Sequence, residues 1–251
     1  MNLELSIIGP ALIAGLLVTA THVPLGVQVL NRGIVFIDLA VAQIAGLGVI
    51  VADALGFEPH GPMVQVAALT AALAGALLLN WTDKHWPAVQ EAVIGVTFIV
   101  AANVAILLLA ADAHGAEHLK DLLIGQILWV KASLLPYVAL VYAVLLVVWL
   151  RWAERIGRMG FYVLFAVAIT ISVQLVGVYL VFASLIVPAL ATMYLRRGRT
   201  LVAYGLGAAA YGAGLALSLV SDLPPGPLIV CSMTVLAVVV VLLSSRSRIP
   251  T

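Results

Sequence analysis

Charged residues are scarce in this sequence, and their scarcity excludes a soluble protein. Asp, Glu, Lys and Arg make up 9% of the 251 residues, whereas 64% are hydrophobic. A soluble domain carries roughly 25% charged residues, so this chain lacks the polar surface that water requires. We therefore expect an integral membrane protein. The net charge of +1 provides no strongly basic surface, so no nucleic-acid partner is expected.

Cysteine and catalytic motifs are also nearly absent. Cys231 is the only cysteine, so no disulfide can form within the chain, and its position in an apolar run predicts a buried thiol. Neither H-E-x-x-H nor G-x-S-x-G occurs, so an intramembrane enzyme is not expected. The G-x-x-x-x-G-K-[ST] loop that holds ATP phosphates is missing too. Any ATP-driven activity would therefore require a separate ATPase chain.

Long apolar runs divide the chain into eight or nine segments that could span a membrane. A helix needs about 20 mostly apolar residues to cross a bilayer. Two runs meet at Gly177 with almost no polar gap, so they are either two short spans or one bent helix. We expect an all-α protein with a single transmembrane domain over residues 1–251. The runs lie at about 6–30, 34–55, 62–80, 90–111, 134–150, 160–176, 177–195, 201–220 and 227–244.

Lysine and arginine are concentrated in one alternating set of the gaps between these runs. Only Lys120 and Lys131 fall in the opposite set. Because cytoplasmic loops retain cations, this bias predicts nine crossings, with the N-terminus outside and the C-terminus inside. The ten cations on the cytoplasmic side are Arg32, Lys84, Arg151, Arg155, Arg158, Arg196, Arg197, Arg199, Arg246 and Arg248.

A proline within apolar sequence marks a segment that this orientation places at the cytoplasmic face. Pro188 has no amide N–H, and its ring clashes with the preceding turn of a helix. We therefore expect a short helix to begin near Pro188, to lie across the membrane surface and to end at Arg196 and Arg197. Such a helix would dock a cytoplasmic partner. The alternative is an ordinary helix end with arginines at the interface.

Three polar residues within the spans are candidates to line a path for an ion, because a polar or ionisable side chain in a span is costly. Asp38 lies close to the cytoplasmic face, where a salt bridge or a helix cap is the alternative role. Gln43 lies deeper and stands about 140° around a helix from Asp38, so the two do not share a face. Interhelical hydrogen bonding is its alternative role. His22 precedes Pro24 in the first span and is either a ligand or a packed core residue.

The outer gap from about 112 to 133 contains three further candidates. If this stretch is helical, His114, Glu117 and His118 lie on one face with a spacing suited to metal ligands. The cluster would then collect a divalent cation above the membrane. The alternative is a solvated loop that contains histidines by chance.

Motifs in both halves of the chain resemble those of the permease subunits of metal-ion ABC importers, the ABC-3 family. Members typically show G-x-x-L, then L-[IL]-x-P-A-x-x-A, then a P-x-G-P turn. Ala191 stands one residue before the usual second alanine. The passage from the first span into the second is also similar. The residues that carry the resemblance are Gly26, Leu30, Arg32, Gly33 and Phe36, the stretches Gly177–Leu180 and Leu185–Ala189, and the turn Asp222–Pro227.

The resemblance implies the fold of type II ABC importer permeases, with a short cytoplasmic coupling helix. That helix would contact the ATPase through Pro188, Ala189, Thr192, Arg196 and Arg197. The resemblance also implies a homodimer in the cytoplasmic membrane of a prokaryote, cytoplasmic ABC ATPases and an extracytoplasmic metal-binding protein. The expected cargo is a divalent metal, zinc first, with manganese or iron as alternatives. ATP would act on the partner chain, and no covalently bound cofactor is expected.

The second span departs from the family pattern. Many members carry G-D-A-x-S-H there, whereas this chain has Gln43 in the histidine place and Asp38 one position before the expected aspartate. An amide oxygen is a weaker ligand than imidazole for a borderline metal such as zinc. A path that relays the ion therefore fits better than a tight intramembrane site. A stand-alone secondary transporter or channel for a small cation is the alternative function.

Overall fold

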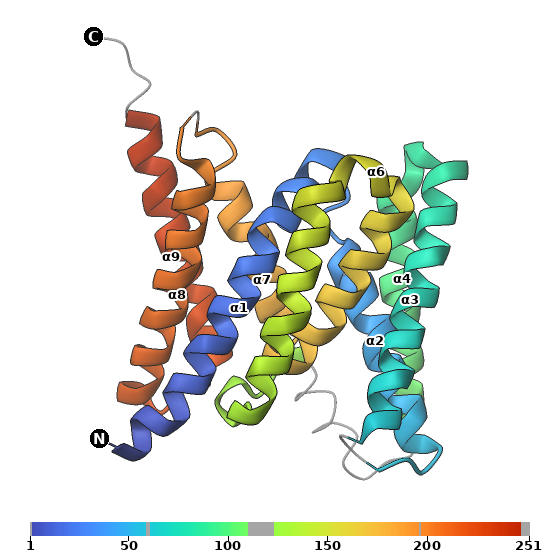
Figure 1. The fold of residues 1–251 in the computed structure, drawn as a ribbon, viewed down its shortest axis with the longest axis horizontal. Coiled ribbons are helices and arrows are strands. Elements are labelled where there is room, and N and C mark those ends of the chain that lie inside the picture. The colour runs from blue at the N-terminus through green and yellow to red at the C-terminus, as the bar shows by residue number, and fades with distance from the viewer. Residues whose placement is uncertain (1, 59–60, 110–122, 196, 247–251) are drawn as a thin grey trace. The chain divides into compact units, whose positions relative to one another are not determined.

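The computed structural model is helical wherever the chain forms a regular element (Figure 1). It describes residues 2–58, 61–109, 123–195 and 197–246, and no strand occurs among them, which confirms the predicted all-α class. The helices are α1 (Asn2–Arg32), α2 (Ile37–Ala54), α3 (Pro62–His85), α4 (Gln90–Leu109), α6 (Leu135–Val176), α7 (Val178–Ala191), α8 (Arg199–Ser221) and α9 (Pro225–Arg246), with 3-10 turns η1 (Pro87–Val89), η2 (Ile127–Trp129) and η3 (Ala132–Leu134).

Eight helical segments are long and apolar enough to cross a membrane. The shortest, α2, has 18 residues, which corresponds to about 27 Å at 1.5 Å per residue. A bilayer core is about 30 Å thick. The apolar helix α7 has 14 residues and reaches only about 21 Å. The described part of the chain thus has eight full spans and one short apolar helix, and the predicted eight to nine segments are confirmed.

Two glycines with left-handed dihedral angles divide the helices between residues 135 and 191. Gly157, with φ 60° and ψ −158°, separates the two spans within α6. Gly177, with φ 83° and ψ 162°, separates α6 from α7. A glycine adopts such angles without the steric cost that a Cβ brings. Of the two alternatives for the runs that meet at Gly177, the chain forms two helices.

The backbone contacts of the chain group into two compact units, which are described separately. Unit 1 comprises Met1–Arg32, Ile124–Tyr142 and Leu175–Thr251, and unit 2 comprises Gly33–Leu123 and Ala143–Gln174. The single domain over residues 1–251 stays a prediction.

In unit 1, α1 packs against α7 and α8, and α9 packs against the same two helices. Glycines allow the closest approaches. A Cβ on Gly26 would collide with the backbone carbonyl of Leu185, and a Cβ on Gly214 would lie 2.5 Å from Cα of Ile229. Because lipid gives no hydrophobic drive for helix association, small residues that permit close contact stabilise such pairs. Gly214 therefore lets α8 and α9 pack closely.

The contacts of α1 with α8 fix their relative direction. Gly15 lies against Tyr211, and Thr19, one turn later in α1, lies against Gly207. The contacts thus advance along α1 as they go back along α8, so these helices are antiparallel, and α8 and α9 are joined by a short turn. The end of α1, the start of α8 and the end of α9 consequently share one end of unit 1, which we call its basic end. It carries Arg32, Arg197, Arg199 and Arg246.

In unit 2, α2 packs against α3 and α4. Gly48 lies against Ala67, and Ile44, one turn earlier in α2, lies against Gly75 further along α3, so α2 and α3 are antiparallel. The end of α3 is tied to α6 by the ion pair between Arg158 Nη1 and Asp83 Oδ2, at 3.0 Å. Unit 2 therefore also has a basic end, formed by Lys84, Arg151, Arg155 and Arg158.

The helix expected to begin near Pro188 begins ten residues earlier, so that predicted boundary is wrong. α7 starts directly after Gly177 and includes Pro188 in its last part. The continuous apolar run from Val178 favours one helix, and a membrane helix tolerates proline when neighbouring groups satisfy the backbone. At its end, Thr192 Oγ1 donates to the Pro188 carbonyl oxygen at 2.7 Å. Residues 192–194 form a turn rather than part of a helix that lies along the membrane surface.

Two glycines of unit 1 meet backbone to backbone. Gly125 and Gly177 have φ values of 72° and 83°. A Cβ on Gly125 would collide with the backbone of Val176 and Gly177, and a Cβ on Gly177 would collide with Ile124 and Gly125. No side chain separates the segment before η2 from the start of α7.

Candidate functional site

His22 is buried in α1 of unit 1 with one ring nitrogen unpartnered. Its side chain is 0% exposed. Nδ1 lies 3.0 Å from the Val18 carbonyl oxygen, which can only accept, and 3.0 Å from Thr21 Oγ1. The tautomer that satisfies the carbonyl carries its proton on Nδ1 and leaves a lone pair on Nε2, which has no hydrogen-bond partner. A neutral imidazole that donates to a backbone carbonyl has the arrangement usual for a metal ligand.

The face of α1 that carries His22 is the face that packs against its neighbours in unit 1. Gly15, Thr19 and Gly26 follow the same helical stripe and contact α8, α8 and α7. A second buried polar pair, Ser184 Oγ and the Tyr211 hydroxyl at 2.9 Å, links α7 to α8 in the same unit. The interior of unit 1 thus contains polar groups on three helices. Of the polar side chains named in this paragraph and the one before it, only the imidazole has a nitrogen without a hydrogen-bond partner.

Asp38 is buried in the first turn of α2 in unit 2. It is 1% exposed, and neither carboxylate oxygen has a hydrogen-bond partner. The N–H groups of a helix's first turn have no partner within the helix and favour a negative charge. A helix-end role for Asp38, one of the two alternatives, agrees with this position.

Glu91, in the first turn of α4, lies beside the start of α2, and the sequence analysis missed it. Its Oε1 accepts a hydrogen bond from the Phe36 backbone N–H at 3.2 Å, whereas the buried Oε2 has no partner. Asp38 and Glu91 thus each lie in the first turn of a helix, and these two helices pack against each other in unit 2. The available signal was an acidic residue at the beginning of the apolar run at 90–111.

Both the amide nitrogen and the amide oxygen of Gln90, the residue before Glu91, have hydrogen-bond partners. Gln90 is 3% exposed. Its Nε2 donates to the Leu79 carbonyl oxygen at 2.9 Å and to the Tyr162 hydroxyl at 3.3 Å, while its Oε1 accepts from Thr82 Oγ1 at 2.9 Å. At the same end of unit 2, the fold therefore satisfies an amide completely and leaves carboxylate oxygens unpartnered.

The other two predicted path residues are Gln43 in unit 2 and His22 in unit 1. Gln43 is 3% exposed in the same helix as Asp38, and their spacing keeps the two side chains about 140° apart. His22 belongs to unit 1.

The predicted outer cluster, His114, Glu117 and His118, lies outside the described residues. Within the residues that are described, no group of three or more His, Cys, Asp or Glu side chains is placed to hold a metal.

The predicted coupling residues fall into two classes. Pro188, Ala189 and Thr192 are buried, and they hold the end of α7 from within unit 1. Arg197 is exposed beyond that end, whereas Arg196 lies outside the described residues. Tyr194, the last residue of the turn, is 67% exposed, so the turn also presents an aromatic side chain at the surface.

A second exposed turn surrounds Gly157 at the basic end of unit 2. Arg151, Trp152 and Arg155 are exposed before it, and Arg158 pairs with Asp83 after it. The sequence analysis assigned these arginines to the cytoplasmic side but did not recognise the break in the helix that presents them.

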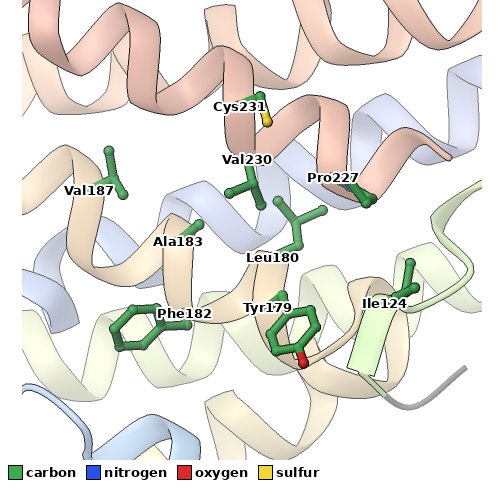
Figure 2. A pocket seen from close by; sticks show the side chains of 10 residues that line it. Ile124, Tyr179, Leu180, Phe182, Ala183, Val187, Pro227, Val230 and Cys231 are labelled. Carbon is green, nitrogen blue, oxygen red and sulfur yellow. The ribbon is translucent and has the colours of Figure 1, made fainter. Parts of the chain in front are cut away.

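An apolar cavity of about 430 Å³ opens between α7 and α9 in unit 1. Figure 2 shows Leu180 and Ala183 on α7 and Val230 and Cys231 on α9 around it. Cys231 is exposed, so its predicted burial is wrong. An apolar run identifies a membrane span but does not tell which of its residues face lipid and which face the protein. In α9 most residues face away from the rest of the chain, since only 17% of the span is buried. The cavity offers no metal ligand except this thiol.

Comparison with known proteins agrees with this architecture. PsaBC from Streptococcus pneumoniae in complex with a Fab has 22% sequence identity and a TM-score of 0.73, over 92% of this chain and 90% of that chain. An inward-facing conformation of an ABC transporter of the metal-chelate type has 16% identity and a TM-score of 0.69, over 93% and 85%. At such identities the likeness shows a shared fold.

Sequence comparison gives the family. An uncharacterized membrane protein from the ycf23-apcF intergenic region of Cyanophora paradoxa is 24% identical in an alignment of 200 residues that covers 70% of this chain and 67% of that protein. The sequence model of the ABC 3 transport family matches residues 4–159 and 153–244, which together cover nearly the whole chain. This multi-pass membrane protein therefore belongs to the ABC 3 transport family, the permeases of metal-type ABC transporters.

Proposed function

We propose that the chain is the membrane subunit of an ATP-driven importer for a divalent metal ion, with zinc as its expected cargo. The family match over both halves of the chain carries this proposal. Ionisable groups buried within spans support it, because their cost in a membrane is usually balanced by a role in moving ions. The chain has no ATP-binding loop of its own, so the energy would come from separate ATPase subunits.

The basic ends of both units are proposed to face the cytoplasm, as the retention of cations there requires. Nine alternating helical segments then put the N-terminus outside and the C-terminus inside. Within unit 1, the antiparallel pairs that place the end of α9 beside the end of α1 support this orientation. The proposed location is the cytoplasmic membrane of a prokaryote.

The ATPase is proposed to dock on the turn after α7, through Tyr194, Arg196 and Arg197. Pro188, Ala189 and Thr192 would then act indirectly, because their buried side chains fix the turn's position. The Gly157 turn of unit 2 is the competing surface, since it also presents several exposed arginines.

Two double substitutions distinguish these surfaces. Arg196→Glu with Arg197→Glu should abolish co-purification of the ATPase if the α7 turn is the dock, whereas Arg151→Glu with Arg155→Glu should leave it intact. The opposite result would move the dock to the Gly157 turn.

The remaining partners follow from the mode of action of such importers. Two copies of the chain would enclose one path, and an extracytoplasmic protein would deliver the metal to it. The description of one structural relative as an ABC transporter of the metal-chelate type supports a metal cargo. His114, Glu117 and His118 are proposed to receive the ion outside. His22, Asp38 and Gln43 are proposed to line its path.

Metal accumulation in cells tests the function directly. Zinc, manganese and iron are measured in parallel in cells lacking the chain, in complemented cells and in cells whose partner ATPase carries a disabled phosphate-binding lysine. The proposal expects low zinc in the first and third strains and normal zinc in the second. Unchanged levels of all three metals would refute it, and uptake that persists without ATP hydrolysis would indicate a secondary transporter or channel.

A further inference from the structure

We propose that the basic end of unit 2 binds an anionic phospholipid of the cytoplasmic leaflet. The inference goes beyond metal transport and does not depend on which cargo the chain carries. It uses the proposed orientation only to name the leaflet. The binding surface, which we call the aromatic–basic patch, comprises Trp81, Lys84, Trp86, Arg151, Trp152 and Arg155, all of them exposed.

An ion pair brings together the two chain segments that form this patch. Arg158 Nη1 lies 3.0 Å from Asp83 Oδ2, and it also donates to the Asp83 carbonyl oxygen at 2.9 Å. These bonds fix the end of α3 against the start of the second span of α6. Lys84 directly follows Asp83, and Arg155 precedes Arg158 across the left-handed Gly157. Cations from two distant segments are thereby held at one end of unit 2.

Positive charge remains after this ion pair has formed. Asp83 is already paired with Arg158. Within the described part of the chain, no acidic side chain forms an ion pair with the three cations of the patch. Residues 83–84 and 151–158 contain four cations against two acids, Asp83 and Glu154. The excess of positive charge complements the phosphate of an anionic lipid, and a guanidinium can hold such a phosphate through two parallel hydrogen bonds.

Exposed tryptophans accompany these cations. Trp81 and Trp86 are 47% and 51% exposed, and Trp152, next to Arg151, is 41% exposed. The Trp81 ring packs edge-on against Trp86, with 5.2 Å between centroids, and lies 4.6 Å from the ring of His85. The end of α3 therefore presents a packed aromatic surface. Tryptophan favours the level of the lipid headgroups, where its ring meets apolar chains and its N–H meets polar groups.

The order of the residues along α3 matches the parts of a phospholipid. Trp81 precedes Lys84 by three residues in a helix that ends at His85, so its Cα lies about 4.5 Å deeper in the membrane. Its ring would contact the upper acyl chains where Lys84 reaches the phosphate. The retention of cations explains on which side Lys84 lies, but it does not require an aromatic surface beneath it. A soluble phosphate would use only the cations, whereas a phospholipid uses both.

Quenching of tryptophan fluorescence by phospholipids with brominated acyl chains tests the patch, because bromine quenches nearby indole rings. The purified full-length protein is titrated with brominated phosphatidylglycerol and, separately, with brominated phosphatidylcholine. A Lys or Arg near the membrane surface strengthens the attraction of an anionic lipid by about fivefold. The three cations of the patch should therefore make binding of phosphatidylglycerol at least about tenfold tighter than that of phosphatidylcholine.

Variants that remove charge from exposed positions identify the residues responsible. Lys84→Gln should weaken binding of brominated phosphatidylglycerol by about fivefold, and Arg151→Gln with Arg155→Gln by about 25-fold. Binding of phosphatidylcholine and the unfolding temperature should stay unchanged. Arg197→Gln is the matched control, because it removes an exposed charge from the basic end of unit 1, and it should keep the wild-type preference.

Several results would overturn the patch. These are equal quenching of the wild type by the two lipids, and a wild-type preference in the double arginine variant. An equal loss in Arg197→Gln would show a general attraction to the positive face rather than a site. Displacement of the brominated lipid by excess inorganic phosphate would show a site for a soluble anion, and loss of ATPase co-purification in the double arginine variant would assign the surface to the ATPase. Each of these outcomes leaves the metal-accumulation test of the proposed function unaffected.

Discussion

Replacing Gly26 by alanine tests the packing of α1 against α7, on which the interior of unit 1 depends. Gly26 lies where the Leu185 carbonyl comes closest to α1, and the added methyl group would collide with that carbonyl and would also lie 3.2 Å from Ala189 Cβ. The obstacle is backbone, so no rotation of a side chain relieves it. The two helices must move apart.

The expected cost follows from the contacts that such a movement removes. Overpacking a well-packed interior typically costs about 1–3 kcal/mol, and the collision with backbone puts Gly26→Ala at about 3 kcal/mol. A gap of about 0.5–1 Å forfeits a quarter to a half of each van der Waals contact along the seam. For a chain of this length, a loss of that size lowers the unfolding temperature by roughly 6–12 °C.

Gly205→Ala provides the matched control. Gly205 also lies within a helix of unit 1, but a Cβ there would meet nothing within 4 Å. Alanine is favoured over glycine in a helix by about 1 kcal/mol, so this variant should match or exceed the wild type. Unfolding of the detergent-solubilised protein is followed by tryptophan fluorescence during heating. If Gly26→Ala unfolds at the same temperature as Gly205→Ala, the close α1–α7 contact is not as described.

Three further predictions concern unit 1. Asp222 adopts left-handed angles (φ 54°, ψ 22°) at the end of α8, so Asp222→Gly should raise the free energy of unfolding by up to about 1 kcal/mol and Asp222→Val should lower it; equal unfolding temperatures would contradict the strained turn. Tyr211→Phe should cost only about 1 kcal/mol because Ser184 keeps its bond to the Leu180 carbonyl oxygen. Ser184→Ala should cost more, about 1–3 kcal/mol, because it leaves the Tyr211 hydroxyl buried without a partner, and the reverse order in thermal unfolding would refute this. Cys231→Leu should leave the unfolding temperature within about 2 °C of the wild type, because its exposed side chain lies on a span with few contacts within the chain, and a drop of more than about 5 °C would place Cys231 in the interior.

The helical spans were predictable because each needs only a long apolar run. The break at Gly177 was also accessible, since a glycine between two apolar runs marked one of the two alternatives. The boundary at Pro188 was not, because proline within a membrane helix is tolerated when tertiary contacts support the backbone. Thr192, whose hydroxyl bonds to the Pro188 carbonyl, supplies part of that support.

The candidate site was only half visible in the sequence. Asp38 stood out as an acid inside an apolar run, and its place at a helix start agrees with the expected position near one face. Glu91 escaped notice because its role depends on α4 packing beside the start of α2, a contact between segments 55 residues apart. The sequence did not reveal that Cys231 is exposed, because side chains that face lipid and side chains in the protein interior are equally apolar.

The backbone contact between Gly125 and Gly177 holds the start of α7 against the segment before η2, so this contact is the pivot for any tilt of the helix. The helix is about 21 Å long, so a tilt of about 10° around Gly177 would displace the Thr192 end by roughly 3–4 Å. At the pivot no side chain is available to yield, because both residues are glycines in direct contact. The start of α7 and the segment that leads into η2 must therefore move together, because no side chain lies between them.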